Sequence, residues 1–342
     1  MIGIGVIGYG YWGPNLVRNF MEAPGSSVLG VSDLRDGRLA EAQSRYPSIK
    51  TTKNPQDLFT DSSINAIAIA TPVSSHFELA MQALRAGKHV LVEKPLASNS
   101  EHAERLIEEA AKRKLVLMVD HTFVYTGAVR KICEMVTTGA LGEIYYYDSV
   151  RVNLGLFQHD VNVIWDLAVH DLSIMDYVLA SKPVAVSATG ISHISGQPEN
   201  VAYITLFFSN NQIAHVHVNW LAPVKVRRTL IGGSEKMIVY DDLEPSEKIK
   251  VYDKGVTLAP QREEVYELLV SYRSGDMWAP KLDQTEGLRT EAIHFIDCIE
   301  NSNCPQTDGA AGLRIVRLLE AAEKSLASRG QLVELPSNQE RL

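Results

Sequence analysis

Short apolar runs alternate with helical patterns along the first third of the chain. Runs rich in valine and isoleucine stand at 4–7, 27–32, 64–70, 89–93 and 116–119. Between them apolar residues recur at helical spacing, as they do over 15–20, 74–84 and 100–113. Near-continuous β-branched strands separated by helices are typical of a parallel, doubly wound sheet. We therefore predict an α/β domain over residues 1–122.

The pattern changes after residue 122. A helix is predicted over 125–136, and strands joined by short turns then follow at 144–153, 184–190, 200–208, 212–220, 226–232 and 236–241. Strands without intervening helices favour a mostly antiparallel sheet, so residues 123–342 form a second, α+β domain. Its C-terminal helices, at about 286–328, are expected to pack back toward the first domain. The stretch 253–281 fits no regular element and is expected to be a loop near the site or an interface arm.

One face of the second sheet needs a cover that the chain does not supply. Few helical patterns follow Leu179, apart from the two near the C-terminus. A large antiparallel sheet buries at least one face, and a second copy of the chain is a common cover. We expect a homodimer or homotetramer that assembles through the open face of the sheet.

Composition narrows the classes of function. The chain has 342 residues, 45% hydrophobic and 22% charged, with a formal net charge of −8. Negative charge argues against nucleic acid or an anionic membrane as a partner. No apolar run approaches the roughly 20 residues needed to span a bilayer, and no basic leader is visible. Three cysteines without metal-ligand spacing suit a reducing compartment, so we expect a cytoplasmic protein without a metal site.

A glycine-rich turn follows the first strand. Gly8, Gly10 and Gly13 form a GxGxxG motif between the run 4–7 and the helical pattern from Asn15. In this context Gly8 permits a tight turn, Gly10 allows the backbone to approach a pyrophosphate, and Gly13 lets the helix pack closely on the strand. The helix amino end then faces the anion. The motif predicts a Rossmann domain that binds a dinucleotide.

The second strand indicates which dinucleotide. It ends at Asp33, 20 residues after Gly13. An acidic side chain there accepts both ribose hydroxyls and repels a 2′-phosphate, which favours NAD. Arg35 stands two residues further on and leaves NADP open as an alternative.

A strand over His89–Glu93 ends at Lys94 and Pro95. Proline cannot continue a central ladder, and ligands of parallel sheets lie beyond the carboxyl ends of the strands. Gly8, Thr71 and Glu93–Lys94 therefore lie along one edge of one crevice. A salt-bridged strand-end lysine is the alternative reading of Lys94.

The segments Gly8–Gly13, Ala70–His76 and Gly87–Pro95 together resemble the Gfo/Idh/MocA family of oxidoreductases. The resemblance implies that Lys94 binds substrate beside the nicotinamide, and a cis bond to Pro95 is common in the family. It also implies cofactor contacts. With the residues of the fingerprint, the predicted cofactor-binding set is Gly8, Gly10, Tyr11, Trp12, Gly13, Asp33, Thr71, Pro72, His76, Glu93, Lys94 and His121.

A polar stripe lies on the predicted helix around residues 162–176. Asp166, His170, Ser173 and Tyr177 recur at i, i+4, i+7 and i+11 on one face. A carboxylate one turn from a histidine raises the pKa of the imidazole, which suits general acid–base work. A helix-surface Asp–His pair is the alternative. The family resemblance implies that Asp166 and His170 lie beside the nicotinamide.

Two departures from the commoner family pattern affect the substrate. Residues 162–165 read Asn-Val-Ile-Trp where many members carry a glycine-rich run, and Val124 and Gly127 stand where many carry arginine and proline. The segments 151–155 and 162–167 are more similar to members acting on nucleotide-linked sugars. The predicted substrate-binding residues are Lys94, Tyr125, Arg151, Asn153, Asn162, Trp165, Asp166 and His170. Arg151, Asn153 and Asn162 also have an ordinary reading as strand-end or turn residues.

The chemistry expected is oxidation of a secondary alcohol. His170 is the predicted base for the hydroxyl proton, Asp166 orients it or shares the hydroxyl, and Lys94 holds the oxygen and stabilises its charge. The roles of Lys94 and His170 can be exchanged. The leading hypothesis is NAD-dependent oxidation, at C3, of UDP-N-acetylglucosamine or its uronate.

Three alternatives stay open. The first is an NADP(H)-dependent ketosugar reductase, and the second is a dehydrogenase of a free polyol or aldose. The third is a non-catalytic regulator that senses the cofactor. In a non-catalytic regulator we expect one or more of Lys94, Asp166 and His170 to be replaced, whereas this chain carries all three.

Overall fold

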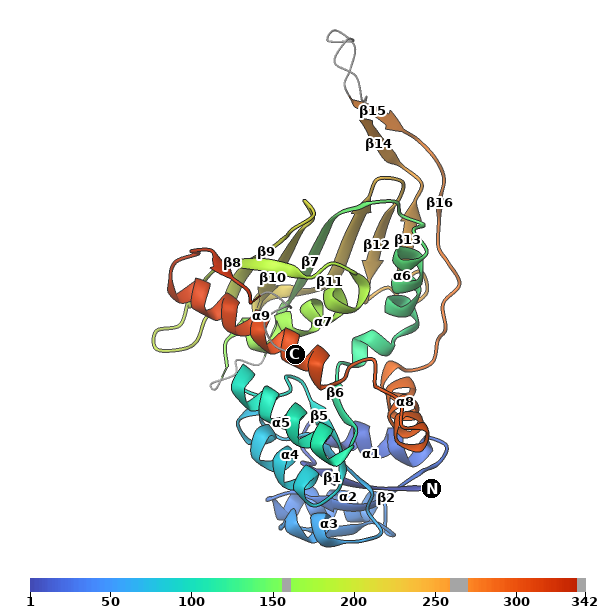
Figure 1. The fold of residues 1–342 in the computed structure, drawn as a ribbon, viewed down its shortest axis with the longest axis vertical. Helices are drawn as coiled ribbons and strands as arrows, with labels where there is room; N and C mark the ends of the chain where they lie inside the picture. Colours follow the sequence, from blue (N-terminus) through green and yellow to red (C-terminus); the bar gives the residue numbers. More distant parts are fainter. Residues whose placement is uncertain (156–160, 259–269, 337–342) are drawn as a thin grey trace. The chain divides into compact units, whose positions relative to one another are not determined.

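The computed structural model describes residues 1–155, 161–258 and 270–336. It divides into two compact units. Unit 1 comprises 1–126 and 284–317, and unit 2 comprises 127–283 and 318–342. Each sheet of the molecule lies within one unit (Figure 1).

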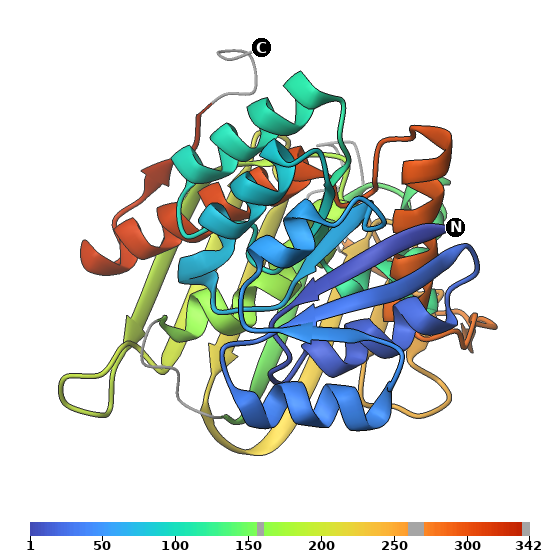
Figure 2. The ribbon, with the colours of Figure 1, turned by 90° about the horizontal axis from the view of Figure 1, so that it is seen from below.

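Unit 1 is built on a six-stranded parallel sheet of order β3-β2-β1-β4-β5-β6 (Figure 2). Its strands are β1 (Ile2–Ile7), β2 (Ser26–Ser32), β3 (Lys50–Thr52), β4 (Ala66–Ile69), β5 (His89–Glu93) and β6 (Leu117–Asp120). Central residues such as Ile67, Val90 and Val92 are completely buried. Strands that are covered by helices on both faces need continuous apolar runs, and this is why the runs in the sequence predicted a parallel sheet. The predicted parallel, doubly wound sheet is confirmed.

The helices of unit 1 follow the strands in alternation. They are α1 (Gly13–Glu22), α2 (Asp36–Arg45), α3 (Gln56–Thr60), η1 (Val73–Ser75), α4 (His76–Arg85), α5 (Ser100–Arg113) and η2 (Thr122–Tyr125). Asn99 caps α5, since its side chain accepts a hydrogen bond from the backbone N–H of His102 at 2.8 Å. Helix α4 packs on α5.

A segment from far along the chain completes unit 1. Helix α8 (Gly287–Asn301) packs on α1 and η2. Arg18 on α1 donates two hydrogen bonds to Glu286, at 2.8 and 2.7 Å. A Cβ on Gly287 would lie 2.9 Å from the carbonyl oxygen of Thr122, so only glycine allows this approach. Helix α9 (Gly309–Ala327) contributes residues to both units.

Unit 2 holds a nine-stranded sheet of order β16-β13-β12-β11-β7-β10-β9-β8-β17. The strands are β7 (Ile144–Leu154), β8 (Pro183–Ile191), β9 (Val201–Phe208), β10 (Ile213–Asn219), β11 (Leu221–Gly233), β12 (Met237–Asp241), β13 (Ile249–Tyr252), β16 (Met277–Trp278) and β17 (Val333–Glu334). All neighbours pair antiparallel except β7 and β10. The predicted mostly antiparallel sheet is confirmed.

The strands of unit 2 alternate between a covered and an open face. Tyr147 and Arg151 on β7 contact Asp171 of α7 (Val169–Val178), which identifies the covered face. On β9, Ile204 and Leu206 are completely buried, whereas Tyr203 remains 44% exposed. Period-two burial of this kind is expected for a sheet with one face on a core.

Three details differ from the expectation. The helix predicted over 125–136 is interrupted at Thr126, which is extended between η2 and α6 (Gly127–Thr137). The stripe helix begins with a π-helical turn at Ile164–Ala168 (η3) before α7. Part of the stretch 253–281 is regular, because β14 (Gly255–Leu258) pairs with β15 (Val270–Arg273); residues 259–269 lie outside the described residues.

Candidate active site

The carboxyl ends of the parallel strands carry most of the predicted cofactor residues. Gly8 follows β1, Asp33 follows β2, and Lys94 follows β5. The strand order reverses between β1 and β4, and open α/β sheets bind ligands at that reversal. The Lys94–Pro95 peptide bond is cis.

The glycine-rich loop has the shape that a dinucleotide needs. Gly8 has φ +92°, and a Cβ on it would lie 2.5 Å from the carbonyl oxygen of Ala70. A Cβ on Gly13 would lie 2.0 Å from the carbonyl oxygen of Gly8. A Cβ on Gly10 would meet only the Arg35 guanidinium, at 3.5 Å, so space remains beside the loop. Within α1, which is described throughout, no side chain caps the amino end and no acidic residue stands in the first turn. These features fit a pyrophosphate.

Asp33 is fixed in place by four hydrogen bonds. It accepts from the backbone N–H of Tyr9 at 2.8 Å, and from Arg35 through its backbone N–H at 2.9 Å, its Nε at 2.9 Å and its Nη2 at 3.0 Å. Burial acts to raise the pKa of Asp33, but the hydrogen bonds from Arg35 and Tyr9 outweigh it and bring the pKa to about 2. The carboxylate is therefore ionised, and the exposed Arg35 side chain covers it.

His76 links two strand ends. Its Nδ1 lies 2.9 Å from the carbonyl oxygen of Pro95, and its Nε2 lies 2.8 Å from that of Thr71. The side chain is 1% exposed, and burial lowers the pKa of His76. A neutral imidazole carries one N–H, so it donates to one of these carbonyls at a time. His76 thus ties the turn after β4 to the turn that carries Lys94.

A second tie joins the glycine-rich loop to β6. The indole Nε1 of Trp12 donates to Asp120 at 2.6 Å, and the Thr122 hydroxyl donates to the other carboxylate oxygen. His121, the next residue, is 2% exposed. Tyr125 is also buried, and its hydroxyl lies 2.9 Å from Thr307 Oγ1. A substrate contact by Tyr125 stays a prediction and requires this bond to be exchanged.

In unit 2, Asp166 lies in the π-helical turn and His170 in the first turn of α7. Both side chains are half-buried. The indole Nε1 of Trp220 donates to the Asp166 carboxylate at 3.0 Å. Ser173 turns its hydroxyl onto the carbonyl oxygen of His170 at 2.8 Å. Single π-helical turns occur often at functional sites, because they redirect a side chain within a helix.

Two of the residues expected around the substrate, Asn162 and Trp165, have hydrogen-bond partners within unit 2. Asn162 caps the π-helical turn, since its Oδ1 accepts from the backbone N–H groups of Ile164 and Trp165 at 3.1 and 3.3 Å. The Trp165 indole donates to Glu323 at 3.2 Å. Asn153 is half-buried near the end of β7. Substrate contacts by Asn153, Asn162 and Trp165 stay predictions.

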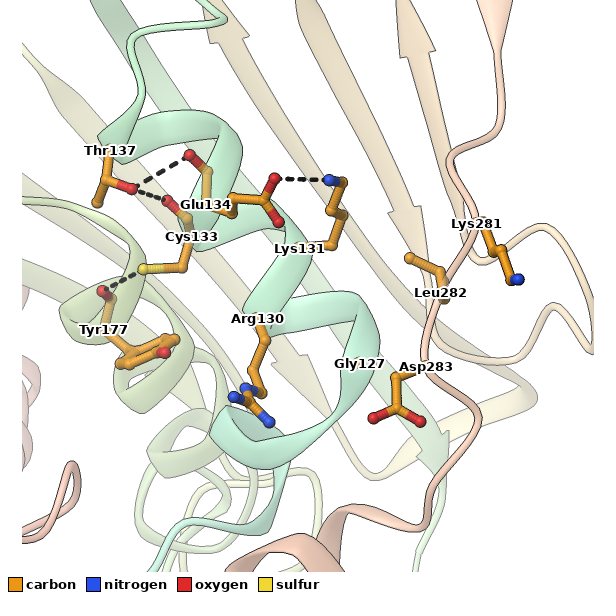
Figure 3. A pocket seen from close by; sticks show the side chains of 10 residues that line it. All are labelled: Gly127, Arg130, Lys131, Cys133, Glu134, Thr137, Tyr177, Lys281, Leu282 and Asp283. Carbon is orange, nitrogen blue, oxygen red and sulfur yellow. Dashed lines mark hydrogen bonds and ion pairs between the residues drawn. The ribbon is translucent and has the colours of Figure 1, made fainter.

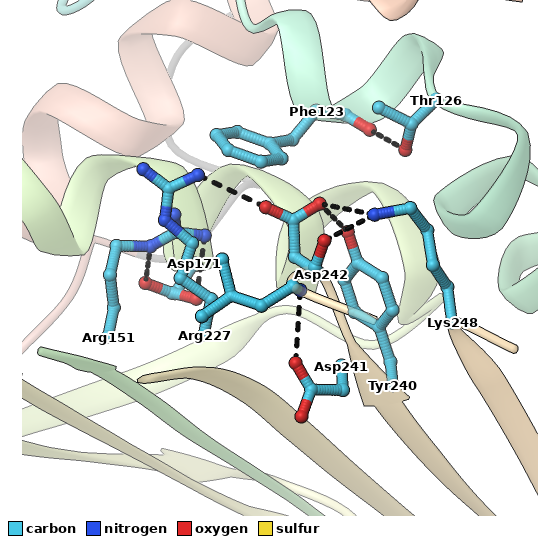
Figure 4. A network of polar contacts seen from close by, with 10 residues as sticks. Phe123, Thr126, Arg151, Asp171, Arg227, Tyr240, Asp241, Asp242 and Lys248 are labelled. Carbon is cyan, nitrogen blue, oxygen red and sulfur yellow. Dashed lines mark hydrogen bonds and ion pairs between the residues drawn. The ribbon is translucent and has the colours of Figure 1, made fainter. Parts of the chain in front are cut away.

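Arg151 forms a buried ion pair. Its Nε donates to Asp171 at 2.6 Å and its Nη2 at 3.3 Å, and both side chains are under 5% exposed (Figure 4). Asp171 directly follows His170, so this pair fixes the first turn of α7 on β7. Removing one partner of such a pair typically costs about 3–5 kcal/mol. A role of Arg151 with a phosphate or carboxylate of the substrate stays a prediction and requires Asp171 to release it.

Unit 2 also has a cavity of about 560 Å³ along α6 (Figure 3). Arg130, Glu134 and Asp283 are among its lining residues, as is Tyr177 on α7. Tyr177 stands seven residues after His170, so both project from the same side of the helix. The predicted substrate residues are not among those that line this cavity.

Sequence reasoning missed four residues that hold the site residues. Trp220 holds Asp166, and Asp171 holds Arg151; Asp120 holds Trp12, and Glu291 lies beside Asp120. Asp120 offered a signal, because it is a strand-end acid like Asp33. Trp220 and Glu291 come from distant segments, and no local spacing marks them.

Fold and loop together define a dinucleotide-binding oxidoreductase, and comparison with known proteins agrees. A family model described as "Oxidoreductase family, NAD-binding Rossmann fold" matches residues 2–121, and one described as "GFO/IDH/MocA C-terminal domain" matches residues 129–239. The chain belongs to the Gfo/Idh/MocA oxidoreductase family. It is an NAD-dependent enzyme.

Named relatives span nearly the whole chain. Myo-inositol 2-dehydrogenase of Thermotoga maritima is 24% identical, covering 95% of this chain and 96% of the relative. UDP-N-acetylglucosamine 3-dehydrogenase of Acidithiobacillus ferrooxidans is 27% identical, covering 91% and 93%. A solved structure of the latter enzyme superposes with a TM-score of 0.79 at 25% identity, over 97% of this chain and all of that one. None of the helices in the described part of the chain has the length and apolar character needed to cross a membrane.

Proposed function

We propose that this protein is a sugar or polyol dehydrogenase that oxidises a secondary hydroxyl, at C3, of a nucleotide-linked sugar. UDP-N-acetylglucosamine and its uronate are the first candidates. The observation that carries the proposal is that the Trp220 indole holds the Asp166 carboxylate four residues before His170, the two residues to which we assign acid–base work. The similarity to a UDP-N-acetylglucosamine 3-dehydrogenase supports the choice of substrate.

The proposal divides the work between the two parts of the chain. Residues 1–122 bind NAD, and residues 123–342 bind the sugar. When bound, NAD accepts the hydride from the carbinol carbon. Lys94 donates a hydrogen bond to the substrate oxygen and stabilises charge on it, while His170 accepts the hydroxyl proton. Asp166 stabilises the imidazolium that results or shares the hydroxyl. The reverse assignment of Lys94 and His170 uses the same groups.

A free polyol is the second candidate substrate. It is favoured by the myo-inositol 2-dehydrogenase relative, whose identity to this chain is nearly the same as that of the UDP-sugar enzyme. Physically, the two substrates differ in a diphosphate. A polyol enzyme needs no cation beyond Lys94, whereas a UDP-sugar enzyme needs groups that offset about two negative charges.

A substrate panel tests the proposal. The purified protein is incubated with NAD and with matched pairs of free and UDP-linked sugars and inositols, while the absorbance of reduced nicotinamide is followed. We expect turnover with UDP-N-acetylglucosamine or its uronate and little with the free sugars. Turnover with inositol alone would transfer the proposal to the polyol candidate. Consumption of NADPH with a ketosugar, and no oxidation of any sugar with NAD, would identify a reductase. NAD binding without any turnover would identify a regulator.

Substitutions test the assigned residues on the substrate so found. His170→Asn and Lys94→Met are each expected to lower kcat about 10²–10⁴-fold, as loss of general acid–base groups does. Lys131→Met is the matched control, because Lys131 pairs with Glu134 on α6. Full rates in both site variants would refute the assignment.

The open face of the unit 2 sheet is the proposed assembly surface. Tyr203 and Phe207 on β9 and Ile213 on β10 lie on the side opposite Arg151 and are 44%, 38% and 44% exposed. Apolar and aromatic side chains in a continuous exposed patch mark interaction surfaces. We propose that a second copy of the chain covers them.

A further inference from the structure

A buried carboxyl group from α8 lies beside the end of β6. Glu291 is completely buried in the middle of α8, and Asp120 is 2% exposed at the end of β6. Both carboxylate oxygens of Asp120 are in use, one by the Trp12 indole at 2.6 Å and the other by the Thr122 hydroxyl. The proposed mechanism makes no use of Glu291.

An ionised Glu291 would have no compensation in this position. Among the residues that the structure describes, neither of its oxygens has a hydrogen-bond partner, and the neighbouring Thr122 hydroxyl donates to Asp120 instead. Burial raises the pKa of Glu291 well above its ordinary value, and the negative charges of Asp120 on β6 and Glu93 on β5 raise it further, against the opposing effect of the Thr122 hydroxyl. Tyr125 faces the same site, and its own pKa is raised well above the ordinary value by burial and by Glu291.

One arrangement satisfies both carboxyl groups. A protonated Glu291 donates its O–H to Asp120, and Asp120 keeps the single negative charge of the pair. The charge on Asp120 then strengthens the short bond from the Trp12 indole, as charge-assisted hydrogen bonds are stronger than neutral ones. A proton on Asp120 instead would weaken the acceptor that Trp12 uses and would leave Glu291 charged without a donor.

We propose that Glu291 is protonated at neutral pH and donates to Asp120, and that this buried carboxyl pair holds Trp12, and with it the glycine-rich loop, in the conformation that binds NAD. Glu291 is thus a positioning residue for the cofactor, and it stands 171 residues after Asp120, where the last strand of the parallel sheet ends. The proposal rests on NAD binding by the loop and is independent of the substrate.

Replacement of Glu291 by glutamine tests the proton. Glutamine keeps a neutral donor of the same shape. The folded pKa of Glu291 lies above the unfolded value, so between these two pKa values the native state holds a proton that the unfolded chain has released. The contribution of this group to stability is therefore complete below the unfolded pKa and is lost as pH rises toward the folded pKa. The folding constant of the wild type relative to Glu291→Gln should therefore fall by up to tenfold per pH unit above about pH 5.

Denaturant unfolding at several pH values measures that ratio. Glu300→Gln, an exposed carboxyl on the same helix, is the matched control and should give a ratio that does not change with pH in this range. Infrared spectroscopy supplies an independent readout: the wild type should show a protonated-carboxyl C=O band at neutral pH that Glu291→Gln lacks. A pH-independent ratio for Glu291→Gln, or no such band in the wild type, overturns the proposal.

NAD affinity tests the link to Trp12. By calorimetric titration, Glu291→Gln should bind NAD within about twofold of the wild type, whereas Glu291→Leu and Trp12→Phe should each weaken binding about tenfold. The double variant Glu291→Leu/Trp12→Phe should bind no more weakly than either single variant, since both remove the same tie. Additive losses overturn the positioning role. If Glu291→Leu does not fold, the infrared band and the glutamine variant still test whether Glu291 carries the proton. Failure of the wild type to bind NAD would instead refute the cofactor assignment.

Discussion

We expect Arg35 to influence the cofactor preference, because it donates hydrogen bonds to the Asp33 oxygens that the ribose of NAD is predicted to use. Three of the four hydrogen bonds to Asp33 come from Arg35, two of them from its guanidinium. The ribose hydroxyls of NAD need those oxygens as acceptors. The Arg35 side chain is 60% exposed, and its guanidinium lies beside Gly10. A 2′-phosphate of NADP bound there would meet this guanidinium. We therefore expect Arg35 to weaken binding of NAD and to strengthen that of NADP.

Arg35→Ala tests this competition. With the guanidinium removed, both Asp33 oxygens accept from ribose, while the backbone bond from Tyr9 still orients the carboxylate. We expect NAD to bind equally or more tightly and NADP to bind about tenfold more weakly, a change of about 1.4 kcal/mol for the lost charge-assisted bonds. Calorimetric Kd values for the two cofactors measure it. Arg38→Ala, which breaks a surface pair with Glu41, is the control. An unchanged ratio of the two Kd values would show that Arg35 takes no part in the choice.

The same carboxylate gives a pH dependence of known sign. The folded pKa of Asp33 is depressed to about 2, so its contribution to stability is present above the unfolded pKa, near 3.9, and is lost as pH falls toward 2. Asp33 is therefore ionised throughout the range in which the enzyme binds NAD. Any loss of NAD affinity near neutral pH has to come from another group.

Local sequence predicted the residues whose chemistry depends on the chain immediately around them. Gly8, Gly10, Gly13 and Asp33 occupy the turn and strand end that their spacing indicated. The partners of site residues depend on contacts between distant segments, which no spacing records. The ring nitrogens of His76 contact the backbone carbonyls of Thr71 and Pro95, and its contact with the cofactor stays a prediction.

At the scale of elements, the strands and helices whose apolar residues recur at a regular spacing were predictable from the sequence. Irregularities within an element, such as a π-helical turn, were not. Alternation gave β9 and β10, and continuous apolar runs gave β4 and β5. The π-helical turn at Ile164–Ala168 has the same composition as an ordinary helix, so the i, i+4 rule placed Asp166 one α-turn from His170. Asp166 lies within this turn, and its carboxylate accepts a hydrogen bond from the Trp220 indole.

Trp220→Phe tests whether this turn serves catalysis. The phenyl ring fills most of the space of the indole but lacks its N–H, so Asp166 loses a donor and its orientation. We expect kcat to fall about tenfold with a smaller change in KM, because the substrate is still bound while the pair Asp166/His170 is misaligned. Steady-state kinetics on the substrate identified above measure both constants.

Trp278→Phe is the matched control, since this residue lies on β16 and is 38% exposed. Its kinetics should equal those of the wild type. A normal kcat in Trp220→Phe would mean that Asp166 needs no donor from Trp220, and the role of the π-helical turn would then be structural.

At the scale of the whole molecule, the open face of the unit 2 sheet is the surface through which we propose that two copies of the chain assemble. Stacked rings line it: Tyr203 lies 4.4 Å from His217 and 6.1 Å from His215, measured between ring centroids. Burial lowers the pKa of His217, and the neighbouring His215 lowers it further. A neutral His217 ring can be buried between two sheets at little electrostatic cost, whereas a charged group there would be desolvated twice in a two-fold dimer.

Phe207→Lys is therefore expected to dissociate the assembly into monomers, because each two-fold interface would bury two unpaired ammonium groups. Light scattering coupled to size-exclusion chromatography gives the mass, and thermal unfolding checks that the variant folds. Ile293→Lys on α8 is the matched control, since Ile293 and Phe207 are 39% and 38% exposed. A monomeric wild type at micromolar concentration, or an oligomer unchanged by Phe207→Lys, would leave this face as the solvent side of a single chain. The aromatic ladder on β9 and β10 would then require a different partner.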